Sequence, residues 1–151
     1  MNAPQFTLEN QAHQKISLAD YKGKWLILYF YPRDNTPGCT IEAVDFTAKK
    51  EEFHKLNAEI AGVSKDSVES HQKFCLKRDL TITLLSDPST EMMQSYNVWG
   101  MKKFMGREFM GTIRSTFIIN PLGEIVHKWS PVKAKGHVEE VYTKLKELHN
   151  T

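Results

Sequence analysis

Apolar residues along the first half of the chain fall in short runs separated by polar and turn-forming residues. The run from Trp25 to Tyr31 is apolar at nearly every position, and Ile60 to Ser64 is similar. A short run without alternation is typical of a strand that is covered on both faces of a sheet. We therefore predict two buried strands here, together with shorter strands at Phe6 to Leu8 and Ile82 to Leu85.

Helical patterns separate these strands. One pattern runs from Cys39 to Leu56, and a second follows the capping pair Asp66-Ser67 and continues through Cys75 to about Asp79. The residues of the first pattern that we expect to face inward are Val44, Ala48, Phe53 and Leu56. One helical turn is predicted after Ser17, a short helix after Asp87-Pro88-Ser89 that ends near Tyr96, and a last helix whose apolar face holds Val138, Val141, Tyr142, Leu145 and Leu148.

The C-terminal half begins with a segment that has no clean period. Val98 to Ile113 is rich in Met, aromatic residues and Gly, and we interpret it as an ordered apolar loop. Ser115 to Ile119 and Glu124 to Trp129 are joined by a Pro-Gly turn and read as an antiparallel hairpin. Early crossovers and a late hairpin predict an α/β domain spanning residues 1–151, with a central mixed β-sheet flanked by helices, the outline of a thioredoxin-like fold.

Charge and cysteine content narrow the function classes. The chain has 20 basic and 18 acidic residues, which are interspersed and leave a formal net charge of +2. This pattern offers no basic stripe for nucleic acid, and no apolar run is long enough to span a membrane. The N-terminus has neither a basic region nor an apolar core, so we expect a cytoplasmic protein. Two cysteines are too few for a disulfide scaffold, and in a reducing compartment any disulfide would be transient and catalytic.

Cys39 lies where the central strand meets the first long helix. Thr36 is a favourable N-cap residue and Pro37 suits the first helical position, so Cys39 falls in the first turn. Unpaired backbone N–H groups there favour a thiolate over a thiol. Lowering a thiol pKa from about 8.5 to about 6 requires about 3.4 kcal/mol, whereas a helix N-terminus contributes about 0.3 to 1 kcal/mol. Most of the stabilisation must therefore come from a nearby cation.

Two blocks of sequence resemble one family. Pro32, Thr36 and Cys39 stand at the spacing Pro-x-x-x-Thr-x-x-Cys, which resembles the active-site motif of peroxiredoxins. The string from Phe30 to Glu42, and the later blocks from Trp99-Gly100 to Ile113-Arg114-Ser115-Thr116-Phe117, resemble the bacterioferritin comigratory protein or peroxiredoxin Q branch. The resemblance covers essentially the whole chain.

This resemblance implies a thiol peroxidase that reduces hydrogen peroxide and organic hydroperoxides without a cofactor. Cys39 would be the peroxidatic nucleophile, which attacks the O–O bond and becomes a sulfenic acid. Thr36 would orient the peroxide, Pro32 would shield the thiolate, and Arg114 would stabilise the thiolate and the transition state. Glu42 matches the branch pattern and would position Arg114.

Cys75 is the expected resolving cysteine. Many members of the branch carry a resolving cysteine five residues after the peroxidatic one, where this chain has Val44. Other members place it on the next helix, where Cys75 is the only candidate. A lone cysteine beside Val68 and Leu76 on a helical wheel is more often a small buried hydrophobe, so the residues alone leave its role open. The resemblance favours a monomer with an intramolecular Cys39-Cys75 disulfide that thioredoxin or a similar dithiol reductant recycles.

Three other functions compete with this interpretation. The first is a one-cysteine peroxidase in which Cys75 has no resolving role. The second, a thiol-disulfide oxidoreductase, is disfavoured because no Cys-x-x-Cys pair begins at Cys39. The third is a redox-regulated binding module whose oxidation exposes the segment from Trp99 to Met110. His71 and Cys75 stand four residues apart, but no second pair at ligand spacing accompanies them, so we predict no metal site.

Overall fold

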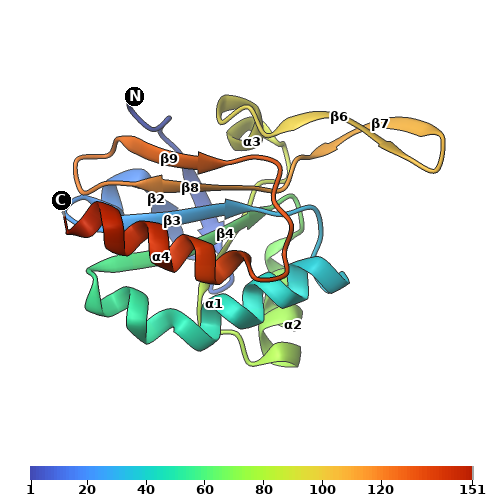
Figure 1. The fold of residues 1–151 in the computed structure, drawn as a ribbon. Helices are drawn as coiled ribbons and strands as arrows, with labels where there is room; N and C mark the ends of the chain where they lie inside the picture. Colours follow the sequence, from blue (N-terminus) through green and yellow to red (C-terminus); the bar gives the residue numbers. More distant parts are fainter. Residues whose placement is uncertain (151) are drawn as a thin grey trace.

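A computed structural model describes residues 1–150, in which a seven-stranded sheet is covered by helices (Figure 1). Thr151, the last residue of the predicted domain, lies outside the described residues. In their order across the sheet, the strands are β2 (Lys15–Ser17), β1 (Thr7–Asn10), β5 (Thr83–Ser86), β4 (Ala58–Ser64), β3 (Trp25–Phe30), β8 (Ser115–Ile119) and β9 (Ile125–Trp129). The helices are the 3-10 turn η1 (Leu18–Tyr21), α1 (Pro37–Lys55), α2 (Val68–Arg78), α3 (Glu91–Ser95) and α4 (His137–His149).

Strand β3 is the centre of the sheet. It pairs in parallel with β4 and antiparallel with β8. Strand β4 also pairs in parallel with β5, whereas the pairs β1–β2, β1–β5 and β8–β9 are antiparallel. The predicted mixed sheet is therefore confirmed, as are the buried strands at its centre and the antiparallel hairpin near the C-terminus.

Both faces of β3 are buried, which explains why its sequence does not alternate. Ile27 and Tyr29 belong to a core that includes residues of α1, α2 and α4. Leu26, Leu28 and Phe30 belong to a second core, which α3 and the N-terminal segment cover. Figure 1 shows α1 and α4 side by side on one face of the sheet, below the strands in this view. From the C-terminal end of β3, a short loop leads into α1.

The prediction of a loop between Val98 and Ile113 is wrong. This segment forms a separate antiparallel hairpin of β6 (Trp99–Phe104) and β7 (Arg107–Thr112), which projects from the body of the molecule (Figure 1). Met105 and Gly106 both have positive φ angles, of 51° and 80°, as a two-residue hairpin turn requires. Most of the hairpin's side chains are exposed, so neither face needs the alternating pattern by which a half-buried strand is recognised.

The inward face predicted for α1 is also partly wrong. Phe53 is fully buried, but Val44 is 40% exposed and Ala48 is exposed as well. The buried side chains of this helix are Cys39, Glu42, Ala43, Phe46 and Phe53. The buried stripe therefore contains a glutamate, a residue type that is read as solvent-facing when only the sequence is available.

Smaller differences concern the ends of elements. The short strand β2, which pairs with β1, was not predicted. Helix α3 begins at Glu91, three residues after the predicted initiating Pro88. The Asp87 carboxylate instead accepts hydrogen bonds from the backbone N–H groups of Met92 and Met93. Among residues 1–150, no helix combines the length and apolar character needed to cross a membrane.

The observed face of α1 predicts a large difference between two substitutions in it. Phe53 is fully buried and contacts the ring of Tyr142 edge-on at 5.5 Å, so Phe53→Ala should lower the free energy of unfolding by about 3 to 5 kcal/mol. Val44→Ala should lower it by about 1 kcal/mol or less, because that side chain is 40% exposed. Urea denaturation of both variants measures the two values. Similar losses in the two variants would contradict the observed orientation of the helix.

Candidate active site

The first turn of α1 presents Cys39. Thr36 occupies the N-cap position with extended backbone angles, and Pro37 is the first helical residue, as the sequence predicts. The Thr36 carbonyl accepts the first helical hydrogen bond, from the N–H of Thr40, at 2.9 Å. Cys39 therefore lies beside the N–H groups that have no helical partner, and its side chain is only 1% exposed.

Arg114 brings a cation into contact with this cysteine. Its Nη2 donates a hydrogen bond to Cys39 Sγ at 3.2 Å, across 75 positions of sequence. Gly38 makes this approach possible, since a Cβ atom at that position would lie 3.0 Å from Nη2. The structure thus places a guanidinium at the start of α1. A cation was expected there, because the helix N-terminus alone contributes too little to stabilise a thiolate.

Glu42 holds the other side of the same guanidinium. Arg114 Nη1 donates to Glu42 Oε1, and the glutamate side chain is fully buried. Burial raises the pKa of Glu42, while the adjacent Arg114 counteracts that rise. Burial opposes the charge of Arg114, but Cys39 and Glu42 together raise the pKa of Arg114 above its ordinary value. The guanidinium is a fixed positive charge between two acidic groups.

Thr36 and Pro32 lie in the loop that joins β3 to α1. The Thr36 hydroxyl donates to the carbonyl of Arg33 at 2.8 Å and does not cap the helix with its side chain. Pro32 is half-buried. Arg114 therefore makes the direct contact with Cys39, whereas Thr36 and Pro32 lie in the loop that leads to the helix of Cys39.

Cys75 lies in the second half of α2. It is half-buried against the core that includes α1, and both cysteines are free thiols. Burial, and secondarily the negative charge of Asp34, raises the pKa of Cys75 to about 11. Cys75 is therefore a protonated and weakly reactive thiol at neutral pH.

Tyr29, which the sequence interpretation treated only as a strand residue, lies beneath the cluster. Its ring stacks on Tyr31 and Phe46, with centroids 5.5 and 4.8 Å away. Burial, followed by the charge of Glu42, raises the pKa of Tyr29 well above its ordinary value. A Cβ atom at Gly62, its partner on β4, would lie 2.7 Å from the ring. An isolated glycine inside a buried strand is the sequence signal for such a close approach.

Lys102 of β6 is a second basic residue that the sequence interpretation did not assign to the site. Its Nζ donates to the carbonyl of Thr112 at 2.9 Å. Burial lowers the pKa of Lys102, and the charge of Arg114 lowers it further, while Cys39 acts in the opposite direction. The base of the β6–β7 hairpin therefore adds positive potential near Cys39.

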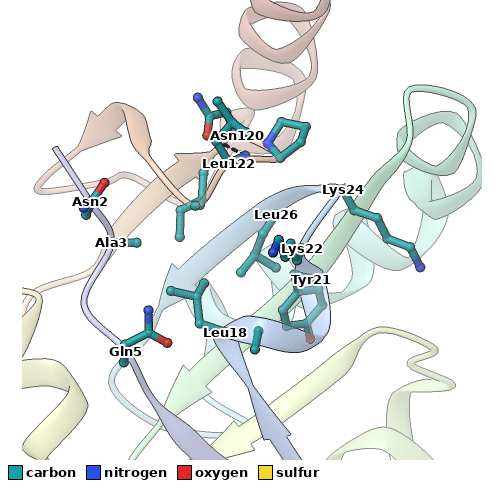
Figure 2. Close-up of a pocket in the computed structure, with 14 residues that line it drawn as sticks. Asn2, Ala3, Gln5, Leu18, Tyr21, Lys22, Lys24, Leu26, Asn120 and Leu122 are labelled. Atoms are coloured by element: carbon teal, nitrogen blue, oxygen red, sulfur yellow. Dashed lines mark hydrogen bonds between the residues drawn. The ribbon is translucent and has the colours of Figure 1, made fainter.

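A separate pocket of about 290 Å³ lies far from these residues (Figure 2). Its lining includes Leu18, Tyr21, Leu26 and Leu122, which Figure 2 shows grouped around the start of β3. Cys39 follows the other end of that strand. The pocket therefore contains none of the predicted site residues.

Known proteins resemble this chain over nearly its whole length. Residues 1–128 match the AhpC/TSA family. Peroxiredoxin Bcp of Bacillus subtilis (strain 168) is 45% identical over 146 residues, which cover 97% of this chain and 93% of that protein. Peroxiredoxin Bcp of Escherichia coli (strain K12) is 36% identical and covers 96% and 93% of the two chains.

Solved structures agree with these relatives. Peroxiredoxin Q of Xanthomonas campestris superposes with a TM-score of 0.91 at 40% identity, covering 95% of this chain and 91% of that one. The mixed sheet and this neighbour confirm the thioredoxin-like fold expected from the sequence. The chain therefore belongs to the AhpC/TSA family and is a peroxiredoxin, a thiol-dependent peroxidase of the bacterioferritin comigratory protein or peroxiredoxin Q branch.

Proposed function

We propose that Cys39 is the peroxidatic nucleophile of this thiol peroxidase. The observation that carries the proposal is the 3.2 Å contact between Arg114 Nη2 and Cys39 Sγ at a helix N-terminus. Two charges about 4 Å apart interact by about 4 kcal/mol at an effective dielectric constant of 20, several times the contribution of the helix terminus. The cation is thus the larger of these two electrostatic influences on the sulfur.

The thiolate attacks one oxygen of the hydroperoxide. A sulfur–oxygen bond forms, the O–O bond breaks, and the second oxygen leaves as water or an alcohol once it is protonated. Charge moves from sulfur to the departing oxygen during this step, so donors aimed at that oxygen accelerate it. A guanidinium has five N–H donors, and the contacts with Cys39 and Glu42 leave others for the peroxide.

Three residues support this step in the proposal. Thr36 uses its hydroxyl proton on the Arg33 carbonyl, so its oxygen is left to accept the proton of the hydroperoxide and orient it. Pro32 shields the thiolate from one side of the loop. Glu42, buried and bonded to Nη1, fixes the plane of the Arg114 guanidinium.

We propose that Cys75 resolves the sulfenic acid of Cys39 as an intramolecular disulfide, which thioredoxin or a similar dithiol then reduces. Two cysteine-to-serine variants of the Xanthomonas campestris protein alter positions separated by the same 36 residues as Cys39 and Cys75, which supports this pairing. Both cysteines lie on helices and are free thiols, so we propose that turns of α1 and α2 unwind to bring their Cα atoms within the distance of about 7 Å that a disulfide needs.

The remaining features of the proposal concern substrate, assembly and compartment. A structure of the Xanthomonas campestris bacterioferritin comigratory protein is titled for its alkyl peroxide reduction activity, which supports organic hydroperoxides as substrates beside hydrogen peroxide. We propose a monomer in which residues 1–151 form one domain, and a cytoplasmic location in keeping with the sparse use of cysteine. The β6–β7 hairpin is exposed while both cysteines are free thiols, so its exposure does not require oxidation. We therefore do not propose a redox-regulated binding function for it.

Removing the guanidinium tests its role on the departing oxygen. Arg114→Ala should lower the second-order rate constant for peroxide about 10²- to 10³-fold, because it removes preorganised donors as well as the charge. Arg114→Lys, the matched control, keeps the charge and should recover only the part that depends on thiolate formation. Stopped-flow peroxide kinetics and pH-dependent alkylation of Cys39 measure the two effects separately. Equal losses in the two assays would contradict stabilisation of the departing oxygen.

Mass spectrometry after one equivalent of peroxide tests the resolving role. The wild type should contain a Cys39-Cys75 disulfide, Cys75→Ser should accumulate a sulfenic acid at Cys39, and Cys39→Ser should remain unmodified. Steady-state peroxide reduction coupled to thioredoxin should then fail in both variants. A sulfenic acid that persists in the wild type would instead identify a one-cysteine peroxidase.

The environment of Cys75 predicts a pH dependence. Since its pKa is about 11 in the folded protein, alkylation of Cys75 in the Cys39→Ser variant should rise up to about pH 11. In denaturant the midpoint should fall to about 8.5. The folded state holds this proton more tightly, so this group stabilises the fold below about pH 8.5 and that contribution is lost as the pH rises toward 11. A native midpoint near 8.5 would show that burial does not suppress this thiol.

A further inference from the structure

A second buried polar cluster lies beside the site and takes no part in the steps above. Its centre is the contact between His71 Nδ1 and Asp34 Oδ2, at 2.7 Å. The His71 side chain is fully buried and that of Asp34 is only 2% exposed. Charged or polar side chains rarely occupy such positions unless all their bonding groups are satisfied.

The surrounding hydrogen bonds satisfy both residues. The Asp34 carboxylate accepts from the Tyr31 hydroxyl at 2.6 Å and from the Ser70 hydroxyl at 2.8 Å. His71 Nε2 faces the carbonyl of Leu85 at 3.0 Å. Both ring nitrogens of His71 therefore face oxygen atoms, and neither is left without a partner. The cluster is a buried hydrogen-bond network centred on the contact between Asp34 and His71.

This cluster joins the two segments that carry the cysteines. Asp34 lies in the loop five residues before Cys39, and His71 lies one helical turn before Cys75. A second bond reinforces the link, because the backbone N–H of Asp34 donates to Asp66 Oδ2 just before α2 begins, at 2.8 Å. Each cysteine therefore follows one residue of the Asp34–His71 contact by four or five positions in the sequence.

The cost of separating the pair decides how the two helices can unwind. Breaking this buried contact leaves polar groups of Asp34 and His71 without partners in a medium of low dielectric constant, which costs more than releasing a few helical hydrogen bonds to water. The first turn of α1 and the end of α2 can therefore open while the contact between Asp34 and His71 stays closed. Residues after His71 then carry Cys75 toward Cys39 over a short tether, which raises its effective concentration.

We propose that the Asp34–His71 pair is a clamp that remains closed during resolution, so that Asp34 and His71 are positioning residues for disulfide formation. The proposal rests on the resolving role proposed for Cys75. In the step that it promotes, the Cys75 thiolate attacks the sulfur of the Cys39 sulfenic acid. The S–S bond forms, the S–O bond breaks, and the departing hydroxide is protonated to water.

Two amide substitutions at one position test the clamp. His71→Asn places an N–H donor where Nδ1 lies and keeps the bond to Asp34, whereas His71→Gln places one where Nε2 lies and keeps only the bond to Leu85. Both replace the imidazole ring with an uncharged amide, so they form a matched pair. Rapid-quench mass spectrometry after a pulse of hydrogen peroxide gives the rates of sulfenic acid formation and disulfide formation separately.

The clamp predicts different effects on the two rates. In His71→Gln, disulfide formation should slow about tenfold or more, while in His71→Asn it should stay within about threefold of the wild type. Sulfenic acid formation should be within about threefold of the wild type in both. Equal slowing in the two variants, or faster disulfide formation in His71→Gln, would overturn the clamp. A wild type that forms no disulfide would refute the resolving role itself, and the clamp with it, so the two failures are distinguishable.

Hydrogen exchange of the wild type provides a test that needs no substitution. In the disulfide form, amides at residues 74–78 and in the first turn of α1 should lose protection relative to the dithiol form, while those at residues 70–72 should keep it. Loss of protection at residues 70–72 equal to that at residues 74–78 would mean that the clamp opens, and would overturn the proposal.

Discussion

The Arg114 guanidinium, held between Glu42 and Cys39, is the interaction on which the site depends. Strand pairing explains how a residue so distant in sequence reaches the helix start. Strand β8 runs antiparallel to β3 with Ser115 opposite Phe30, so Arg114 stands just beyond the end of β3, where the loop toward α1 begins. The register of the central sheet therefore sets the distance between guanidinium and sulfur, and the absence of a side chain at Gly38 lets them meet.

The polar groups around this contact are not all satisfied. Within residues 1–150, the Tyr29 hydroxyl, the Thr40 hydroxyl and Glu42 Oε2 are buried without a hydrogen-bond partner. Buried unpaired polar groups cost stability and are uncommon in native proteins. Thr40 and Glu42 follow Cys39 on the first turns of α1, and Tyr29 lies near both Glu42 and Cys39. These groups and the stacked rings of Tyr29, Tyr31 and Phe46 therefore lie around the cysteine.

Local signals in the sequence were sufficient where the structure depends on local chemistry. The uninterrupted apolar run identified β3, and the Thr36-Pro37 pair located the start of α1 within the chain. Patterns failed where burial did not follow residue type. Val44 was expected inside but is 40% exposed, whereas Glu42 is buried, because the ion pair that makes Glu42 a core residue cannot be seen along one helix.

Contacts between distant segments could not be derived from the pattern at all. The need for a cation near Cys39 followed from energetics, but only the family resemblance indicated Arg114. The Asp34–His71 pair, separated by 37 positions, carried no signal, and a histidine four residues from a cysteine suggested only half of a metal site. The β6–β7 hairpin was missed because most of its side chains are exposed, so its sequence does not alternate between apolar and polar residues.

The two cysteines have opposite environments, and this contrast determines the order of events in the proposed cycle. Cys39 contacts a guanidinium at a helix N-terminus, whereas burial and the charge of Asp34 keep Cys75 protonated, with a pKa of about 11. A thiol in that state competes neither for peroxide nor for external disulfides. Unwinding the end of α2 removes Cys75 from both influences, so the same motion that brings the sulfurs together also activates the second one. Asp34 has two roles in such a cycle: it suppresses Cys75 in the folded protein and, through His71, keeps the helix near Cys39 when it unwinds.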